Sequence, residues 1–247
     1  MKRVLALFIL AIFSISMAKS QDPNMFRFGL KIQPSVSWLN PETRGFESDG
    51  AKLNFGYGLI LEKSFNMTTV LYSGVLLTGF GGPVNFPGGD EAYYFQLSET
   101  DTSKVFVNSR THRLHYVEIP LHLKFRTPEI GYMTYNAHFG LDLGIRTKAQ
   151  SNYEGRLNST TGSAITIDEY EMKSNVGFLR LGLNVGIGGE YNLAGSTSIV
   201  MGLSYYNGFT NILSRRSDHL YASNNQAENA SLSFKSHAVA LTLGVLF

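Results

Sequence analysis

The sequence predicts an all-β protein whose strands close into one eight-stranded antiparallel barrel. Three observations predict this fold. Oily and polar side chains alternate over segments of roughly 10 to 15 residues, eight such segments follow one another, and the connections between them are alternately long and short. This combination is typical of a closed up-and-down transmembrane β-barrel with four long extracellular loops and short periplasmic turns.

The alternation is clearest in four segments, 53–62, 117–126, 135–146 and 179–191. In each of them one row of side chains is apolar or aromatic, and the other row is polar or glycine except at Ile60 and Pro120. Weaker versions of the same pattern occupy residues 26–33, 69–79, 197–206 and 237–247. The count of eight is even, as bacterial outer-membrane barrels require.

The polar rows indicate which face is turned inward. A soluble barrel, with an oily interior, would show the same alternation. The polar rows here are rich in glycine and sparsely charged, which favours a small crowded lumen over a solvated surface. The strands also exceed the usual globular length and match a tilted membrane crossing. We therefore expect the oily rows to face lipid.

The connections support the same interpretation. Long connections span 40–51, 83–111, 150–173 and 211–231, and short ones span 65–68, 127–132 and 192–196. We expect the long ones on the outer side of the membrane. Aromatic residues on the oily rows gather near the short turns and predict an interfacial girdle. They are Phe26, Phe65, Phe125, Tyr191 and Phe247, with Tyr132 in an adjoining turn.

Two long connections contain strand-like segments of their own. In 83–111, residues 93–97 and 104–107 flank the turn-rich stretch 99–103, which predicts a hairpin above the membrane. In 150–173, Ile165 and Ile167 indicate an extension of a strand.

The N-terminus predicts export. Lys2 and Arg3 precede an uncharged apolar run over 4–15, and small residues follow as far as Ser20. The run is shorter than the roughly 20 residues that a transmembrane helix needs, so we expect a cleaved signal peptide. The predicted domains are therefore a signal peptide at 1–20 and an outer-membrane barrel at 21–247, with the protein located in the bacterial outer membrane.

Composition excludes several function classes. The formal net charge is only +2 and the Lys and Arg residues are scattered, so a nucleic-acid partner is not expected. The chain has no cysteine, which removes disulfides, Cys-ligated zinc, a thiol nucleophile and a lipid-attachment site. We expect neither a cofactor nor a metal.

Charges of both signs lie on the polar rows. An eight-stranded barrel has room only for side chains, so we interpret these charges as a mutually neutralising core and not as a pore. Pro120 interrupts a strand and predicts a bulge or a water-bridged gap in the ladder. The charges are Arg27, Lys31, Glu62, Glu118, Lys124, Asp142, Arg146, Arg180 and Glu190.

No catalytic site is predicted. His115 and His237 have the oily parity near the outer end, but their strands lie on opposite sides of a closed ring. His112 and His115 should point to opposite faces of one strand, which prevents chelation. Trp38 and Phe46, near the first long loop, are expected to anchor at the interface or to pack the loop.

The chain resembles the PorT-like outer-membrane β-barrel proteins of Bacteroidota over nearly all of its mature length. The segment most typical of that family is 116–121 (YVEIPL) with Lys124 and Phe125. Further matching segments are 28–31, 57–62, 72–77, 186–191, 205–212 and 243–247. The resemblance implies an eight-stranded barrel inserted by the outer-membrane assembly machinery, which reads a C-terminal aromatic residue such as Phe247.

The resulting expectation is a non-enzymatic outer-membrane barrel with a structural or partner-binding role in the envelope. Its expected partners are the lipid bilayer, the assembly machinery and envelope or secretion-system proteins, because the name-giving member of the resembling family supports protein secretion. Two alternatives from other classes remain open. One is a lipid-modifying enzyme of the outer membrane, and the other is a soluble ligand-binding barrel of lipocalin type.

Overall fold

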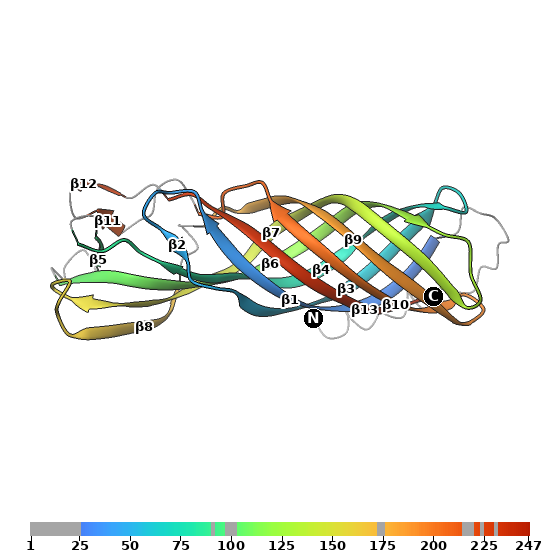
Figure 1. The fold of residues 1–247 in the computed structure, drawn as a ribbon, viewed down its shortest axis with the longest axis horizontal. Helices are drawn as coiled ribbons and strands as arrows, with labels where there is room; N and C mark the ends of the chain where they lie inside the picture. Colours follow the sequence, from blue (N-terminus) through green and yellow to red (C-terminus); the bar gives the residue numbers. More distant parts are fainter. Residues whose placement is uncertain are drawn as a thin grey trace, which may run out of the picture.

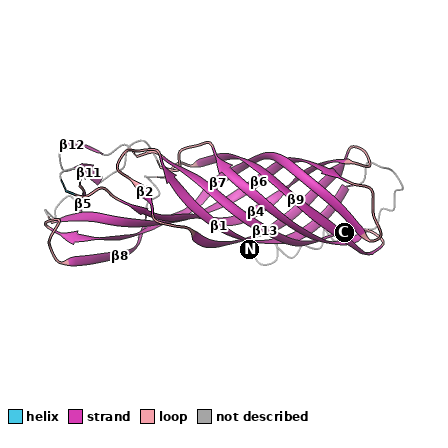
Figure 2. Ribbon diagram, in the orientation of Figure 1, coloured by secondary structure: helices cyan, strands magenta, loops and turns pink. Residues whose placement is uncertain are grey.

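The computed structural model describes residues 26–89, 92–96, 103–171, 176–213, 220–222, 225–229 and 232–247. Long tilted strands form a barrel, and short strands project from one end of it (Figure 1). Apart from connecting loops, the described chain is almost entirely strand (Figure 2). None of its helical segments is long and apolar enough to cross a membrane. The expected signal peptide, 1–20, lies outside the described residues.

Eight long strands form the barrel, and each pairs antiparallel with the next. The last strand pairs with the first, Gly29 lying opposite Leu246, so the strands make a ring. All eight predicted segments are confirmed as strands. They are β1 (Phe26–Pro41), β3 (Lys52–Ser64), β4 (Thr69–Asn85), β6 (Lys104–Arg126), β7 (Met133–Leu157), β9 (Leu179–Ala194), β10 (Thr197–Gly208) and β13 (Phe234–Leu246).

The oily rows face outward, as predicted. Leu53 is 79% exposed and Phe55 57%, whereas Glu62 and Lys124 on the opposite face are 0% and 3% exposed. The same alternation of exposed and buried residues runs along β7 and β9. The soluble lipocalin-like alternative needs an oily interior and is therefore wrong.

The short turns lie at one end of the barrel, at the right of Figure 1, and the residues of the predicted aromatic girdle belong to these turns or to the strand ends beside them. The turns join β3 to β4, β6 to β7 and β9 to β10. All six predicted girdle residues are exposed, by 41% to 67%. A band of large exposed apolar side chains separates this girdle from the long-loop end.

The long connections contribute five short strands, β2 (Glu47–Ser48), β5 (Tyr93–Gln96), β8 (Ala164–Glu171), β11 (Leu220–Ala222) and β12 (Asn225–Asn229). We call β12, β11, β5, β8 and the adjoining ends of β6 and β7 the outer sheet. One row of backbone partners crosses all six strands: Asn229, Tyr221, Tyr94, Phe106, Arg156 and Ala164. The predicted hairpin and the extension at Ile165 and Ile167 are thus confirmed, but most of the turn at 99–103 lies outside the described residues.

Beyond the membrane band, β4 moves inward beneath β1 and β3. The ladder between β3 and β4 stops at Tyr57 and Leu77, while β4 stays paired with β6 as far as Asn85. The hydroxyl of Ser37, on the inner face of β1, donates to the carbonyl oxygen of Gly81 at 2.7 Å. Phe80 thereby enters an apolar cluster that covers the lumen at the long-loop end. The cluster includes Leu39, Phe46, Val84, Phe86, Leu114, Tyr116, Tyr153, Tyr206 and Phe234.

Two prolines mark gaps in the ladder. The β4–β6 pairing keeps its register between Tyr72–His122 and Leu76–Glu118, but no pairs form around Pro120. Pro34 interrupts the β1–β13 ladder in the same way. A proline has no N–H to donate, so each gap lies on the side where that donor is missing. The predicted gap at Pro120 is confirmed, and the alternative of a bulge there is wrong, because the register on both sides is preserved.

We predict that Gly81→Ala destabilises the barrel by about 2 kcal/mol or more. Gly81 has φ +149°, and a Cβ there would lie 2.0 Å from the His112 carbonyl oxygen. The measurement is urea unfolding in lipid vesicles, followed by the fluorescence of the single tryptophan, Trp38. Gly88→Ala is the matched control, because nothing lies within 4 Å of its Cβ position. Equal midpoints for the two variants would contradict the close approach of Gly81 to the His112 carbonyl in the β4–β6 ladder.

Candidate functional site

The candidate site is the polar interior of the barrel, where the inward rows of all eight strands meet. Its buried polar residues form three layers between the short-turn end and the apolar cluster described above. Each layer has its own chemistry, and together they decide whether the lumen can conduct or bind.

The basal layer is a closed set of four charges from four strands. Lys124 Nζ lies 2.6 Å from Glu62 Oε1 and 2.5 Å from Glu190 Oε1. Arg27 bonds the same two carboxylates, with Nη1 2.7 Å from Glu190 Oε2 and Nη2 against Glu62. Two positive and two negative charges therefore neutralise each other. Buried charges of this kind persist only when they are paired in this way.

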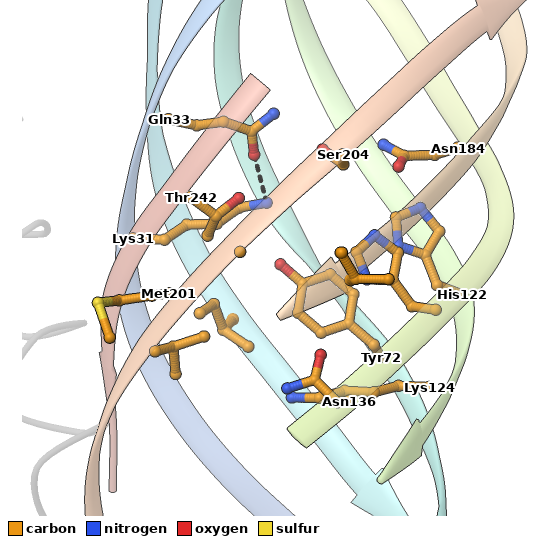
Figure 3. Close-up of a pocket in the computed structure, with 15 residues that line it drawn as sticks. Lys31, Gln33, Tyr72, His122, Lys124, Asn136, Asn184, Met201, Ser204 and Thr242 are labelled. Carbon is orange, nitrogen blue, oxygen red and sulfur yellow. Dashed lines mark hydrogen bonds between the residues drawn. The ribbon is translucent and has the colours of Figure 1, made fainter. Parts of the chain in front are cut away.

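The middle layer combines imidazole, amide and carboxylate groups; Figure 3 shows the imidazole of His122 and the amide of Asn184. His122 Nε2 lies 2.7 Å from Asp142 Oδ1, and Asn184 Nδ2 donates to the other oxygen of Asp142 at 2.7 Å. His122 stacks on His138 with ring centroids 5.1 Å apart. In Figure 3 the Lys31 ammonium points toward Gln33, to which it donates at 2.9 Å.

A cavity of about 50 Å³ lies among these middle-layer side chains. Residues of both the basal and the middle layer line it, among them Lys31, Tyr72, Lys124 and Asn136 (Figure 3). A water molecule needs roughly 10 to 15 Å³ of such volume, so the cavity has room for a few waters. It is far smaller than the roughly 300 Å³ at which ligand pockets begin.

The upper layer surrounds the guanidinium of Arg180, which is 2% exposed. Arg180 forms an ion pair with Glu118. Its Cζ lies 3.4 Å from the ring centroid of Phe80, 4.3 Å from that of Tyr206 and 4.7 Å from that of Tyr116. Three aromatic faces and one carboxylate therefore hold a single cation at the top of the lumen.

The neutralising core predicted from the sequence is three separate groups in the structure. Seven of the nine predicted charges join carboxylate–cation or carboxylate–histidine pairs. The other two, Lys31 and Arg146, bond uncharged oxygens, of Gln33 and of the Val176 carbonyl. His122, His138 and Asn184 were not predicted as members. Their position on the polar rows could have indicated this. A neutral side chain with an N–H group can donate a hydrogen bond to a buried carboxylate, as a cation can.

Outside the membrane band, one exposed ion pair ties a loop to the barrel. Glu42 follows β1 and accepts from Lys235 Nζ at 2.6 Å and from the Ser233 hydroxyl at 2.9 Å. The bond from Lys235 is the main reason that the pKa of Glu42 lies below its ordinary value.

The histidines of the outer surface do not form a common site. His115 is on β6 and His237 on β13, four positions apart in a ring of eight strands. His237 Nδ1 bonds the Tyr205 hydroxyl at 2.9 Å, and its ring stacks on Trp38. His112 is fully buried and His115 exposed, as expected for opposite faces. Among the described residues, no three His, Asp or Glu side chains are grouped to hold a metal.

The two aromatic residues near the first long loop have different surroundings. Phe46 packs against Phe86, Tyr93 and Phe234 with centroids 4.8 to 5.6 Å apart, so it fills the loop region. Trp38 lies on the outer face, beside Tyr205 and His237. The expectation of loop packing thus applies to Phe46, and the expectation of an interfacial position applies to Trp38.

A family model described as outer membrane protein beta-barrel domain matches residues 17–214. The chain belongs to this family. The match covers the segment from β1 through β10, and the ring is completed by β13. As a family member with an apolar outer band, this outer-membrane barrel is located in the bacterial outer membrane.

Several solved structures are similar to this outer-membrane barrel. Neisserial surface protein A is 12% identical, with 89% of this chain and 95% of that chain covered and a TM-score of 0.41. OprG from Pseudomonas aeruginosa is 11% identical, with 93% and 99% covered and a TM-score of 0.46. Ail of Yersinia pestis, solved with a heparin analogue, is 15% identical, with 90% and 99% covered and a TM-score of 0.38. No curated protein matches the chain.

The height of the exposed apolar band on the barrel agrees with the thickness of the outer membrane. On β7 the outward row is apolar from Tyr135 to Ile145. Ten steps of about 3.4 Å, tilted by about 40°, span roughly 26 Å, close to the band of an outer-membrane barrel.

We predict that Lys124→Met costs about 3 to 5 kcal/mol of folding stability, because it leaves two buried carboxylates with one cation. Adding Glu190→Gln should restore part of that loss by removing one of the two negative charges. Both are measured by urea unfolding in vesicles. Arg126→Gln is the control, since Arg126 lies at the edge of the basal layer and, among the described residues, bonds Ser64 and the Met67 carbonyl but no carboxylate. Additive losses in the double variant would contradict the coupling.

Proposed function

We propose that this protein is a non-enzymatic outer-membrane barrel, closed to solutes, whose outer sheet binds a partner protein of the envelope. The observation that carries the proposal is the outer sheet itself. A barrel that only strengthened the membrane would need nothing more than short connections. Here the described parts of three long connections and the ends of two barrel strands pair in one sheet, which we call the platform.

The platform is anchored on the barrel. β6 has 23 residues and β7 has 25, so both run from the short-turn end into the outer sheet without interruption. Val107 and Tyr153, in this upper part, belong to the apolar cluster above the lumen. The outer sheet is therefore held rigidly against the barrel, and a preorganised surface binds a partner at a lower entropic cost.

The edge strand β8 offers a place for a partner. Among the described residues, β8 pairs on one side only. Exposed Asp168, Glu169 and Glu171 lie toward its C-terminal end, and Glu169 has φ +54°. Charges and an irregular backbone discourage indiscriminate strand pairing. A partner strand that supplied basic side chains would be selected by the same features.

The resemblance to PorT-like proteins supports a partner of the envelope or secretion machinery, since it covers the barrel strands from 28–31 to 243–247. In this proposal residues 1–20 direct export, Phe247 is read by the assembly machinery, and the outer sheet faces away from the cell. The contacts of the lumen support the absence of transport, because three layers of side chains fill it.

A lipid-modifying activity finds less support. The histidines that could serve it, His115 and His237, lie on opposite sides of the ring, and the bonded neighbour of His237 is the phenol of Tyr205. A nucleophile and its base have to lie within hydrogen-bonding reach of each other.

We predict that the purified protein inserts into planar bilayers without producing open-channel current. Between the basal layer of paired charges and the Arg180 layer, the cavity lined by Lys31, Tyr72 and Lys124 has a volume of about 50 Å³, too small for an open channel. A general porin in the same bilayers serves as the positive control, and insertion is verified by protection of the barrel from protease. Stable current steps from the folded protein would contradict the closed lumen.

The partner proposal is tested with single cysteines, which the chain otherwise lacks. Thr166→Cys, on the edge of β8, should react with a membrane-impermeant maleimide on intact cells, and Asn66→Cys, in a short turn, should not. A photoreactive maleimide at Thr166→Cys should then form a discrete adduct with another protein.

The matched control is Gly88→Cys, which is exposed at the long-loop end but lies off the β8 edge. If the maleimide labelled Asn66→Cys and not Thr166→Cys, the short turns and not the outer sheet would face away from the cell, which would contradict the proposed orientation. Adducts that are equal at the two outer positions, or absent from both, would refute binding at this edge.

A further inference from the structure

A group of basic side chains lies on the outer surface where the apolar band ends at the long-loop side. On β6 the outward row changes from Val117 to His115, and on β7 from Ile145 to Lys148. On β3 it ends at Leu53, next to Lys52. This level is where the headgroups of the surrounding lipids lie.

The side chains of this group are neighbours. His115 lies directly opposite Lys148 in the β6–β7 ladder, and Arg113 follows two residues away on the same face. Lys52 lies close enough to Arg113 and to His115 for their charges to interact. We call Lys52, Arg113, His115 and Lys148 the basic notch.

The inward displacement of β4 creates the notch. Where β4 passes beneath β3, the inner face of β3 covers the outer face of β4, and a Cβ on Gly79 would lie 3.1 Å from Asn54 Oδ1. Lys52, two residues before Asn54 on the same face, therefore points toward the outer surface of the β4–β6 pair. In an undisturbed ring it would point into the lumen.

The charges of the notch have no counter-ion within the described part of the chain. No ion pair joins a described carboxylate to Lys52, Arg113 or Lys148. The Nε of Arg113 is buried and donates no hydrogen bond. Elsewhere at this end of the barrel, Lys235 is paired with Glu42 at 2.6 Å. A group of like charges without a carboxylate partner, at the edge of the apolar band, favours the binding of an anion from outside the protein.

The surroundings favour a lipid over a free anion. Directly below the notch lie exposed apolar side chains, among them Phe55 (57% exposed), Leu77 (40%) and Ile119 (40%). A lipid can place its phosphate among the cations and its acyl chains along this surface. Arginine and lysine side by side bind phosphate by charge-assisted hydrogen bonds.

We propose that the basic notch binds the phosphate group of a membrane lipid headgroup, with the acyl chains of that lipid on the adjoining apolar face of β3, β4 and β6. The inference goes beyond partner binding by the outer sheet. The notch itself depends on the membrane position of the barrel, but the choice of lipid rests on the orientation in the proposed function. That orientation assigns the lipid to the outer leaflet, so we choose diphosphoryl lipid A as the probe.

The test is native mass spectrometry of the full-length protein released from detergent micelles, titrated with diphosphoryl lipid A. The expected result is a bound lipid whose apparent Kd rises at least tenfold in Lys52→Gln/Arg113→Gln/Lys148→Gln. Lys63→Gln is the matched control, because Lys63 is an outward-facing cation at the short-turn end, next to Phe26. This control should bind as the wild type does. Each variant is first shown to be folded by its heat-dependent mobility on a gel.

Further arms distinguish the alternatives. Dephosphorylated lipid A should bind the wild type as weakly as diphosphoryl lipid A binds the triple variant. If millimolar inorganic phosphate displaces the lipid, or if phosphate alone binds equally well, the ligand is a free anion and the proposal is overturned. Equal binding by wild type and triple variant overturns it too.

If the triple variant does not fold, Lys148→Gln alone is tested, because Lys148 is exposed. This variant is expected to weaken binding severalfold, and no change would count against the proposal. Because binding in micelles needs no orientation, this result is independent of surface labelling at Thr166.

Discussion

The constraint on which this structure depends is that backbone N–H and C=O groups cannot remain unbonded in hydrocarbon. A strand that crosses the bilayer has to be paired on both sides, and only a closed ring meets that condition for all strands. The pairing of β1 with β13 satisfies it here. The ring then determines the chemistry of the two faces, since one row of every strand meets lipid and the other meets a narrow interior. The two gaps in the ladder at Pro34 and Pro120 occur where the missing donor is the proline's own.

The narrow interior explains the character of the lumen. Large rings and charged groups from opposite walls have to share it, and they fit because the facing positions are small. A Cβ at Gly186, for example, would lie 2.4 Å from the imidazole of His138. Charges drawn into this space are either paired, as in the basal layer, or placed against aromatic faces, as Arg180 is. The close packing of the lumen side chains and the pairing of their charges thus have the same cause, the narrowness of the barrel interior.

Much of the fold could be predicted from the sequence, because a two-residue period over lipid-facing strands leaves a regular trace. The strands at 135–146 and 179–191, the hairpin that contains β5 and the outward direction of Phe55 all follow from that period. The displacement of β4 could not be predicted in this way, because it depends on contacts of Gly81 with Ser37, 44 residues away in sequence. The same is true of the candidate site. Charges on the polar rows could be recognised, but their partition into three layers depends on the stagger between strands, and neutral members such as Asn184 carry no charge signal.

The composition of the outer sheet has a consequence for biogenesis. Its middle strands belong to β6 and β7, but β11 and β12 come from the connection that immediately precedes the last strand. In the proposed orientation, the platform therefore cannot be completed until nearly the whole polypeptide has crossed the membrane. An assembly intermediate stalled before β11 would leave the edge of β5 unpaired. The complete six-stranded surface is thus present only once insertion is nearly finished. A ligand that contacts all six strands would therefore not bind incompletely inserted protein.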